Sequence, residues 1–393
     1  MTQSTGRLDI DIAWLETVLS DLLSIPSPTG YTDNIVRHVC GILEGLGVKY
    51  ELTRRGAIRA KVSGLKKASA RAIVSHVDTL GAQVKALKAN GRLELVPIGT
   101  WSARFAEGAR TTIFSERGAY RGTILPLRAS GHTYGDEVDT LPVGWDYVEL
   151  RVDARCGSAE DLAAHGIEVG DIVAIDPQPE FHDSGFINSR HLDNKAGVAV
   201  MLAAMKAMMD APPPPVDIYW LFTIAEEVGH GAAAILLPEI ASMVAVDNGT
   251  SAPGQNSSEF GVTLSMGDMS GPFDFHLTRK LADLCAENEI GCRKDVFKHY
   301  RSDSASAIEA GADVRTALAT FGVDASHGYE RIHMHALRSL AELITAYVRS
   351  PVDIRRDERL MSGLEGFTSQ PMQPAEHQDT TGVRTLVGGG KED

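Results

Sequence analysis

The sequence predicts an α/β fold, in which a mixed β-sheet with helices on both faces is interrupted by an inserted β-rich domain. Short unbroken apolar runs at 72–75, 218–224 and 243–246 are typical of strands buried on both faces of a sheet. Helical apolar spacing alternates with these runs, whereas residues 83–171 show strand-like alternation without a long helical pattern. An alternation of strand and helix that is broken once predicts one discontinuous domain with an insert.

The elements before the insert are two helices and three strands. Helical spacing covers 12–24 and 33–46, and the segment Ile25-Pro-Ser-Pro-Thr-Gly30 separates the two helices because proline and glycine break helices. Strand-like segments follow at 48–53, 57–63 and 72–75. The last of them runs directly into His76.

The insert and the later elements are predicted from the same patterns. Strand alternation in the insert is clearest at 92–96, 122–125 and 147–152. The sheet is expected to resume at 171–175, and an apolar helix over 194–209 ends before the four prolines at 212–215. Later, helical segments at 272–289 and 329–349 flank a strand-like segment at 314–321.

These patterns give the expected domain boundaries. Residues 1–82 and 172–355 should form the discontinuous sheet domain, and residues 83–171 the inserted one. From 356 to 393 the chain is polar and without periodicity, and it ends in Gly388-Gly-Gly-Lys-Glu-Asp393. This composition predicts a disordered tail.

Composition and charge exclude several classes of partner. The formal net charge of −14 argues against nucleic acid or an anionic membrane. The longest apolar stretch, 196–205, is half the length of a membrane span, and the polar first residues lack the apolar core of a signal peptide. The four cysteines are too dispersed for a disulfide framework, and Cys285 and Cys292 are interpreted as core thiols. We therefore expect a cytoplasmic protein.

Five dispersed residues have the types and positions of metal ligands. They are His76, Asp193, Glu227, Asp247 and His327. Imidazole and carboxylate ligands without a thiolate suit a borderline ion such as zinc in an open catalytic site. Most of them follow a predicted strand or begin a helix, and open α/β sheets bind their substrates at the carboxyl ends of strands. The set predicts a two-metal hydrolase.

Asp193 is the candidate bridging ligand, because a carboxylate can touch two ions at once. His76 and Asp247 would complete the first metal site. Glu227 and His327 would complete the second, and each ion would keep room for water and substrate.

Two further carboxylates have candidate catalytic roles. Asp78 follows His76 by two residues and can lie behind the imidazole, where it would fix the tautomer of the ring. Glu226 is adjacent to Glu227 and should therefore point elsewhere. This makes Glu226 the candidate general base, which takes a proton from the attacking water and passes it to the leaving amine.

Each motif also has an ordinary structural interpretation. A His-x-Asp at a strand end is commonly structural, a Glu-Glu pair commonly begins a solvated helix, and Asp247-Asn-Gly could be a tight turn. It is the joint occurrence of the five residues that favours a metal site. His191 and His230 lie near ligands in sequence and could line the site, whereas His333 begins a helix.

Three of these motifs resemble those of the dinuclear aminopeptidase family that includes the glutamyl aminopeptidases and the tetrahedral (TET) aminopeptidases of prokaryotes. The bridging aspartate of that family lies in Leu-Asp-Asn-Arg/Lys-x-Gly, matched by residues 192–197. Its two glutamates lie in Glu-Glu-Val-Gly, matched by 226–229, and its first histidine in His-x-Asp-x-x-Gly, matched by 76–81. The resemblance covers residues 10–350, including the insert.

The resemblance implies a zinc-peptidase-like fold and hydrolysis of the N-terminal peptide bond of short peptides. It implies two divalent metal ions, zinc in the first place, with cobalt or manganese as alternatives. It also implies that the insert is a dimerisation domain and that the dimers often assemble into a hollow dodecamer, so we expect a homo-oligomer built from dimers. The segments His299-Tyr-Arg-Ser-Asp303 and Ser326-His-Gly-Tyr-Glu330 resemble the subgroup associated with the osmoprotectant N-acetylglutaminylglutamine amide.

The sequence departs from the family pattern near the site. Thr79 stands where the family usually has an acidic residue. His327 is followed by Gly-Tyr-Glu, one residue shorter than the usual Ser-Pro-x-Glu, which leaves His333 as the alternative ligand. Arg301 stands where glycine is common, so Arg301 and Asp303 are candidate substrate contacts, although Arg301 could instead pair with an acidic neighbour.

Two other functions are open on the sequence alone. Related two-metal carboxypeptidases and deacylases imply a large lid before the last histidine, but here the long gap comes early (193 − 76 = 117 residues, against 327 − 247 = 80). An inactive assembly or binding protein on the same fold would have no need of Glu226. Both observations favour the aminopeptidase.

Overall fold

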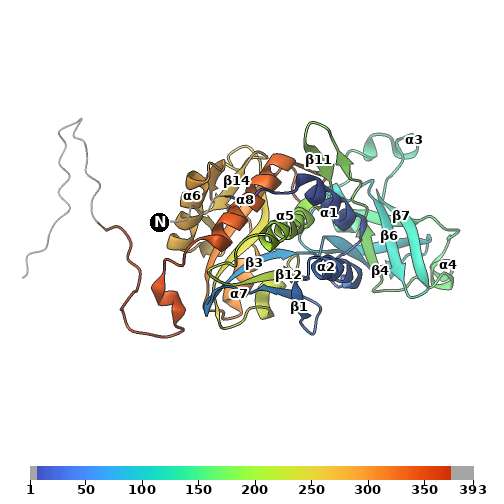
Figure 1. Ribbon diagram of the computed structural model, residues 1–393. Helices are drawn as coiled ribbons and strands as arrows, with labels where there is room; N and C mark the ends of the chain where they lie inside the picture. The colour runs from blue at the N-terminus through green and yellow to red at the C-terminus, as the bar shows by residue number, and fades with distance from the viewer. Residues whose placement is uncertain (1–6, 373–393) are drawn as a thin grey trace, which may run out of the picture.

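The computed structural model describes residues 7–372, and its main layer is an eight-stranded mixed β-sheet (Figure 1). In spatial order the strands are β1 (Lys49–Leu52), β2 (Ile58–Val62), β12 (Val216–Thr223), β3 (Lys66–His76), β13 (Ile240–Thr250), β18 (Arg315–Val323), β14 (Val262–Ser265) and β17 (Cys292–Asp295). The four central strands, from β12 to β18, run parallel to one another. The mixed α/β architecture is therefore as the sequence predicts.

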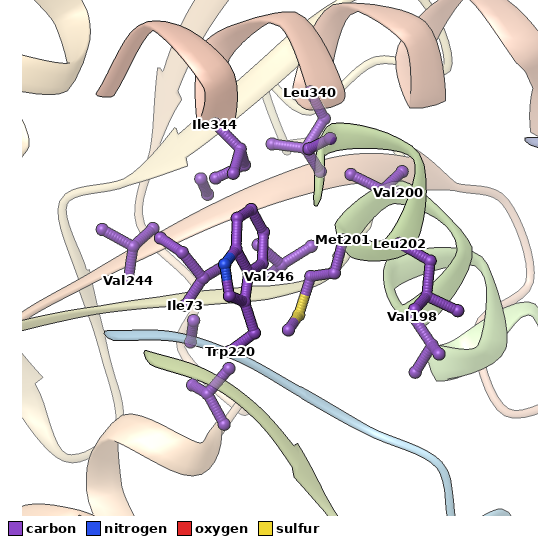
Figure 2. Packing of buried hydrophobic residues seen from close by; sticks show 14 of the residues in the cluster. Ile73, Val198, Val200, Met201, Leu202, Trp220, Val244, Val246, Leu340 and Ile344 are labelled. Carbon is purple, nitrogen blue, oxygen red and sulfur yellow. The ribbon is translucent and has the colours of Figure 1, made fainter. Parts of the chain in front are cut away.

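The central strands are largely apolar in their middle parts because both faces of the sheet are covered. All eight residues of β12 are buried. Figure 2 shows the ring of Trp220 from β12 beside Val246 of β13, with Met201 of α5 (Leu192–Met209) close to it. Trp220 is 1% exposed, and full burial of an apolar side chain of this kind stabilises the fold by about 1.5–3 kcal/mol.

Three long helices pack side by side on the sheet. The helix α5 contacts β3 and β13, with α1 (Ile12–Ser24) and α8 (Met334–Arg349) as its neighbours. The remaining helices are α2 (Asp33–Gly45), α3 (Gly131–Tyr134), α4 (Ala159–Ala164), α6 (Phe275–Glu287) and α7 (Asp303–Glu309). Almost every residue of α5 is buried, so this helix has no solvent face and its sequence is apolar all round.

The insert folds as a closed six-stranded barrel at one end of the molecule (Figure 1). Its strands, in order around the barrel, are β4 (Gly81–Leu87), β5 (Arg92–Ile98), β8 (Val148–Val152), β7 (Gly118–Pro126), β6 (Arg110–Ser115) and β9 (Ile172–Ile175). Neighbouring strands are antiparallel, and the side chains that alternate inward form a hydrophobic core separate from that of the main sheet.

The strand at 171–175 is a correction to the sequence analysis. It does not resume the main sheet, because β9 pairs with β4 and β6 and closes the barrel. The barrel therefore extends from Gly81 to Ile175, beyond the expected limits of 83 and 171. The chain returns through a small sheet made of β10 (Glu180–Phe181), β11 (Phe186–Ser189) and β19 (Glu330–His333). A two-stranded ladder joins β15 (Gly267–Asp268) to β16 (Gly271–Pro272).

The start of the expected disordered tail is also different. A 3-10 turn covers Arg355–Glu358, and Asp357 forms an ion pair with Arg315 at 3.0 Å. Residues 373–393 of that tail lie outside the described residues. In the described part of the chain, no helix combines the length and the hydropathy needed to cross a membrane.

Candidate metal centre and active site

The main sheet brings the predicted ligands together at one edge. The strands β12, β3 and β13 are parallel neighbours, so their carboxyl ends meet. His76 is the last residue of β3, and the two glutamates, Glu226 and Glu227, follow shortly after β12. Asp247 lies within β13, which continues to Thr250, so the tight turn considered for Asp247-Asn-Gly does not form.

Asp193 reaches this edge from the beginning of α5. The backbone angles of Asp193 and Asn194 are not helical, and the peptide bond between them is cis. The regular helix follows, and Asp193 is only 5% exposed. Its carboxylate thus lies between the strand ends and the later segment that carries His327.

The five candidate ligands form two groups that share Asp193. In the first group, ligand atoms of His76, Asp193 and Asp247 all lie within 4.8 Å of one another. In the second, the same holds for Asp193, Glu227 and His327. This is the division between two sites that the sequence analysis expects.

The two histidines approach opposite oxygens of Asp193. The Nε2 atom of His76 lies 3.3 Å from Oδ1, and that of His327 lies 3.2 Å from Oδ2. Asn248 also donates to Oδ2 from its side-chain amide at 2.7 Å. A carboxylate that contacts one histidine through each of its two oxygens has the geometry of a bridging ligand.

Both imidazole rings are oriented by backbone carbonyls. The Nδ1 atom of His76 donates to the carbonyl of Asp78 at 2.9 Å, and that of His327 to the carbonyl of Thr100 at 2.8 Å. A proton held on Nδ1 leaves Nε2 free to act as a ligand, which is how metal-binding histidines are commonly fixed. Because Thr100 belongs to the insert, the barrel takes part in building the site.

The carboxylate of Asp78 lies beside the His76 ring, where it is expected, but its shortest hydrogen bonds are to other groups. Its Oδ1 atom is 3.5 Å from Nδ1 of His76, beyond the distance to the Asp78 carbonyl. The carboxylate also accepts hydrogen bonds from the backbone N–H groups of Glu226 at 3.1 Å and Glu227 at 3.3 Å, and from the Thr29 hydroxyl at 2.6 Å. Asp78 therefore holds the backbone of the glutamate pair.

The two glutamates point towards different histidines. Oε2 of Glu226 lies 3.7 Å from Nε2 of His76, whereas Oε2 of Glu227 lies 3.8 Å from Nε2 of His327. The other oxygen of Glu227, Oε1, is buried and has no hydrogen-bond partner. A buried carboxylate oxygen without a partner is costly unless a cation binds it, so the donor set fits divalent metal ions.

The pKa values of the site carboxylates also favour bound divalent cations. Burial and the repulsion of Asp193 raise the pKa of Asp247 to about 8, and burial in particular holds the pKa values of Glu226 and Glu227 well above the usual range. Burial also opposes the ionisation of Asp193, but hydrogen bonds from the two histidines outweigh it and lower its pKa. Cations between these groups would favour the ionised carboxylates.

A cavity of about 600 Å³ opens beside the ligands. Its lining includes Glu226, Asp247 and His327 from the site, with Gly99 and Thr100 from the barrel. The segment 299–302 and Met269 also line the cavity. The cavity is large enough for the end of a short peptide.

Of the two candidate substrate contacts, Arg301 lies at the cavity and Asp303 does not. Arg301 lines the cavity but pairs with Glu309 at 2.7 Å, which is the acidic neighbour considered from the sequence. Asp303 is 3% exposed and does not line the cavity; it accepts a hydrogen bond from the Thr223 hydroxyl at 2.7 Å. The structure therefore places only Arg301 where a substrate could meet it.

The other histidines lie outside both ligand groups. His333 caps α8 by accepting a hydrogen bond from the backbone of His335, and its Nε2 lies 3.0 Å from the carbonyl of Ser184. His191 donates from Nε2 to the carbonyl of Ile175 at 2.9 Å, and His230 is exposed. Neither His191 nor His230 belongs to a ligand group among the described residues.

Sequence reasoning missed three residues of the site. Asn248 bonds the shared aspartate, and Tyr300 lines the cavity with a buried hydroxyl that has no hydrogen-bond partner. Glu330 accepts hydrogen bonds from the backbone of Asp193 and of His327. The sequence carried a signal only for Glu330, as the acidic residue that follows the last histidine.

Comparison with known proteins decides the family. The family model of the M42 glutamyl aminopeptidases matches residues 56–343. The chain belongs to this M42 family. It is 36% identical to "Putative aminopeptidase YhfE" of Bacillus subtilis (strain 168) over 337 residues, which cover 85% of the chain and 97% of that protein. The M42 chain is therefore a hydrolase of the aminopeptidase class.

Solved structures show the same fold at low sequence identity. A TET aminopeptidase from the marine sediment archaeon Thaumarchaeota archaeon SCGC AB-539-E09 has a TM-score of 0.79 at 16% identity, covering 88% of the M42 chain and 99% of its own. The Pyrococcus horikoshii TET1 peptidase, described as assembling into a tetrahedron or a large octahedral shell, has a TM-score of 0.75 at 20% identity, covering 85% and 99%. Both alignments cover more than four fifths of the M42 chain.

Proposed function

We propose that this protein is a two-metal aminopeptidase that removes the N-terminal residue of short peptides with a free amine. The observation that carries the proposal is the shared carboxylate of Asp193, which belongs to both ligand groups and lines the cavity together with Glu226. Family membership supports the reaction class. The number of metal ions and their identity are part of the proposal.

The first ion would be held by His76, Asp193 and Asp247, and the second by Asp193, Glu227 and His327. Nitrogen and oxygen donors without sulfur, three to each ion, favour zinc in an open coordination, and cobalt or manganese could replace it. When bound, two such cations polarise the scissile carbonyl and acidify the attacking water.

Glu226 supplies the proton transfers in this proposal. It lines the cavity and leaves the ligand role to its neighbour, so its carboxylate can accept a proton from the water and deliver it to the leaving amine. Asp78 keeps the backbone of Glu226 in place through the hydrogen bond at 3.1 Å. The geometry therefore separates the base from the ligands, as a hydrolase requires.

The cavity supports a preference for a free N-terminus. Glu226 lines the space of about 600 Å³ and lies outside both ligand groups, and a carboxylate in that position attracts an ammonium group. An N-blocked peptide lacks that ammonium group. We therefore propose short unblocked peptides as substrates, and the dipeptide amide Gln-Gln-NH2 as a specific candidate from the osmoprotectant resemblance.

We also propose a homo-oligomer built from dimers. The support is the fold shared with TET peptidases, one of which is described as a tetrahedral or octahedral assembly. The cytoplasmic location expected from the sequence stays a proposal, supported by the four cysteines, which are all free in the structure.

A hydrolysis screen tests the function. Short peptides with free and acetylated N-termini are compared, each with zinc, cobalt and manganese. We expect release of the N-terminal residue from free peptides only, and only with metal. A strong preference for acetylated substrates would contradict the aminopeptidase function and indicate a deacylase.

A further inference from the structure

Glu330 ties together two segments of the site that are far apart in sequence. Its Oε2 atom accepts the backbone N–H of Asp193 at 3.1 Å, and its Oε1 atom accepts the backbone N–H of His327, also at 3.1 Å. The side chain is 1% exposed. One buried carboxylate thus uses both of its oxygens to set the distance between the shared aspartate and the last histidine.

Glu330 itself is fixed by the sheet. It is the first residue of β19, where it pairs with Ser189 of β11. The next residue, Arg331, exchanges two backbone hydrogen bonds with Asp324, at 3.0 and 3.1 Å. These pairings close a loop of residues 324–331, and Glu330 stands at its neck while His327 lies near its tip.

The two segments tied by Glu330 have backbone conformations that need support. Ala325 and His327 have positive φ angles of 58° and 64°, and His191, two residues before Asp193, has a φ of 67°. Residues other than glycine adopt this left-handed conformation only where the surroundings hold them there. Each of the two segments donates an N–H group to Glu330, so the loss of Glu330 would release both.

We infer that Glu330 is the positioning residue of the second metal site, since it holds His327 at the distance from Asp193 at which one ion can bind both. This inference rests on the proposed two-metal function. Glu330 is not a ligand, because both of its oxygens are engaged by N–H groups and it belongs to neither ligand group. The His327 ring contacts Asp193 at 3.2 Å and donates to the Thr100 carbonyl, but neither contact fixes the backbone of His327 relative to that of Asp193.

Zinc binding by the purified full-length chain tests the role of Glu330. Glu330→Gln keeps the size of the side chain but places an amide NH2 against one of the two N–H groups. Glu342→Gln is the matched control, because Glu342 is also buried and accepts hydrogen bonds from Arg7 and Arg338, but on α8. Zinc content is measured by mass spectrometry, and affinities by competition with a chromogenic chelator.

We expect the wild type and Glu342→Gln to bind two zinc ions per chain, and the affinity for each ion to be the same in the two proteins. Glu330→Gln should hold the weaker ion about 10–100-fold less tightly, the usual effect of removing a group that orients a ligand. The visible absorption of the cobalt-loaded protein should also change in Glu330→Gln, which a loss of general stability would not produce. Should Glu330→Gln not fold, Glu330→Asp keeps the charge but reaches only one N–H, and the same weakening is expected.

Unchanged zinc affinities and cobalt absorption in folded Glu330 variants would overturn the inference. A wild-type chain that bound no zinc would overturn both this inference and the proposed function. Two bound zinc ions without peptide hydrolysis would overturn the proposed function alone, and the comparison of Glu330→Gln with wild type would still decide the role of Glu330.

Discussion

At the scale of single residues, the adjacent side chains of Glu226 and Glu227 point in different directions, because successive residues cannot easily direct their side chains to the same place. Glu227 lies near His327 and Glu226 lies near His76, and both line the cavity. The hydrogen bonds from both backbone N–H groups to Asp78 keep this arrangement. The division can be tested by changing one glutamate and counting metals.

Glu226→Gln should keep two metals and lose catalysis. The amide has the size of the carboxylate but cannot accept a proton, and loss of a general base lowers kcat by roughly 10²–10⁴-fold. Metal content and steady-state kinetics measure the two effects. Glu44→Gln, a surface change at a residue that bonds Tyr50, serves as the control. Wild-type kcat in Glu226→Gln would contradict the mechanism.

His327→Ala should reduce the bound zinc from two ions to one. His327 belongs only to the second ligand group, whereas His333 caps a helix and lies outside both. His333→Ala should therefore keep both ions. Elemental analysis of the two variants after removal of free metal makes the comparison, and the reverse pattern would show that His333 is the ligand.

The candidate ligands could be predicted because each follows a recognisable local pattern. His76 and the glutamate pair follow apolar strands, and parallel strands deliver their carboxyl ends to one place. Asn248 and Tyr300 could not be chosen in the same way, since their roles arise from contacts across the fold. The position of Glu330 after the last histidine was a signal, but it did not reveal which N–H groups the carboxylate accepts. The pairing of Arg301 with Glu309 likewise depends on how the loop folds.

At the scale of elements, Arg71 joins the central strand β3 to the end of α8. Its guanidinium donates to the carbonyls of Tyr347 at 2.5 Å, Ser350 at 2.9 Å and Pro351 at 2.7 Å, and it is 5% exposed. A cation at the carboxyl end of a helix also interacts favourably with the helix dipole. The planar fork of arginine reaches several carbonyls at once, which lysine cannot do.

Arg71→Met should destabilise the fold by about 1–3 kcal/mol, because it leaves the Ser350 carbonyl without its donor. The carbonyls of Tyr347 and Pro351 keep hydrogen bonds from Ser350 and Lys280. Arg71→Lys should fall between this variant and the wild type. Chemical denaturation measures the free energy of unfolding of all three proteins. A midpoint for Arg71→Met equal to that of the wild type would show that the Ser350 carbonyl finds another donor.

The helices α1 and α2 have nearly the bounds predicted from the sequence, since amphipathic spacing and proline are local signals. The strand β9 was assigned to the wrong sheet, because a short apolar run does not indicate which strands it will pair with. The segment predicted to begin a helix at 329 starts with β19 instead, and α8 begins at Met334. In residues 330–333 the strand pairing with β11 outweighs the helical spacing of the apolar residues.

At the scale of the whole molecule, metal should contribute to stability. A ligand that binds only the folded state stabilises it by about 2.7 kcal/mol when its concentration is 100 times Kd. Chelation of the zinc-loaded chain should therefore lower its melting temperature by several degrees, as measured by calorimetry. Asp193→Asn, which lacks the shared ligand, should show almost no response. An unchanged melting temperature of the wild type after chelation would contradict the metal assignment.

The barrel leads to an expectation for assembly. Light scattering at micromolar concentration should give the mass of a homo-oligomer containing an even number of chains, because the proposed building block is a dimer. The scattering mass of a single chain would contradict the proposed dimer. A wild-type mass in the Glu226→Gln variant is the control, since that change should not affect subunit contacts.

The order of the ligands along the chain has a consequence for biosynthesis. A ribosome adds His76 early, but His327 follows 251 residues later (327 − 76 = 251), and its ring is oriented by Thr100 from the barrel. The second ligand group therefore stays incomplete until nearly all of the family-matched region has emerged. An aminopeptidase whose ligands are ordered in this way gains its activity only after most of its own chain has been synthesised.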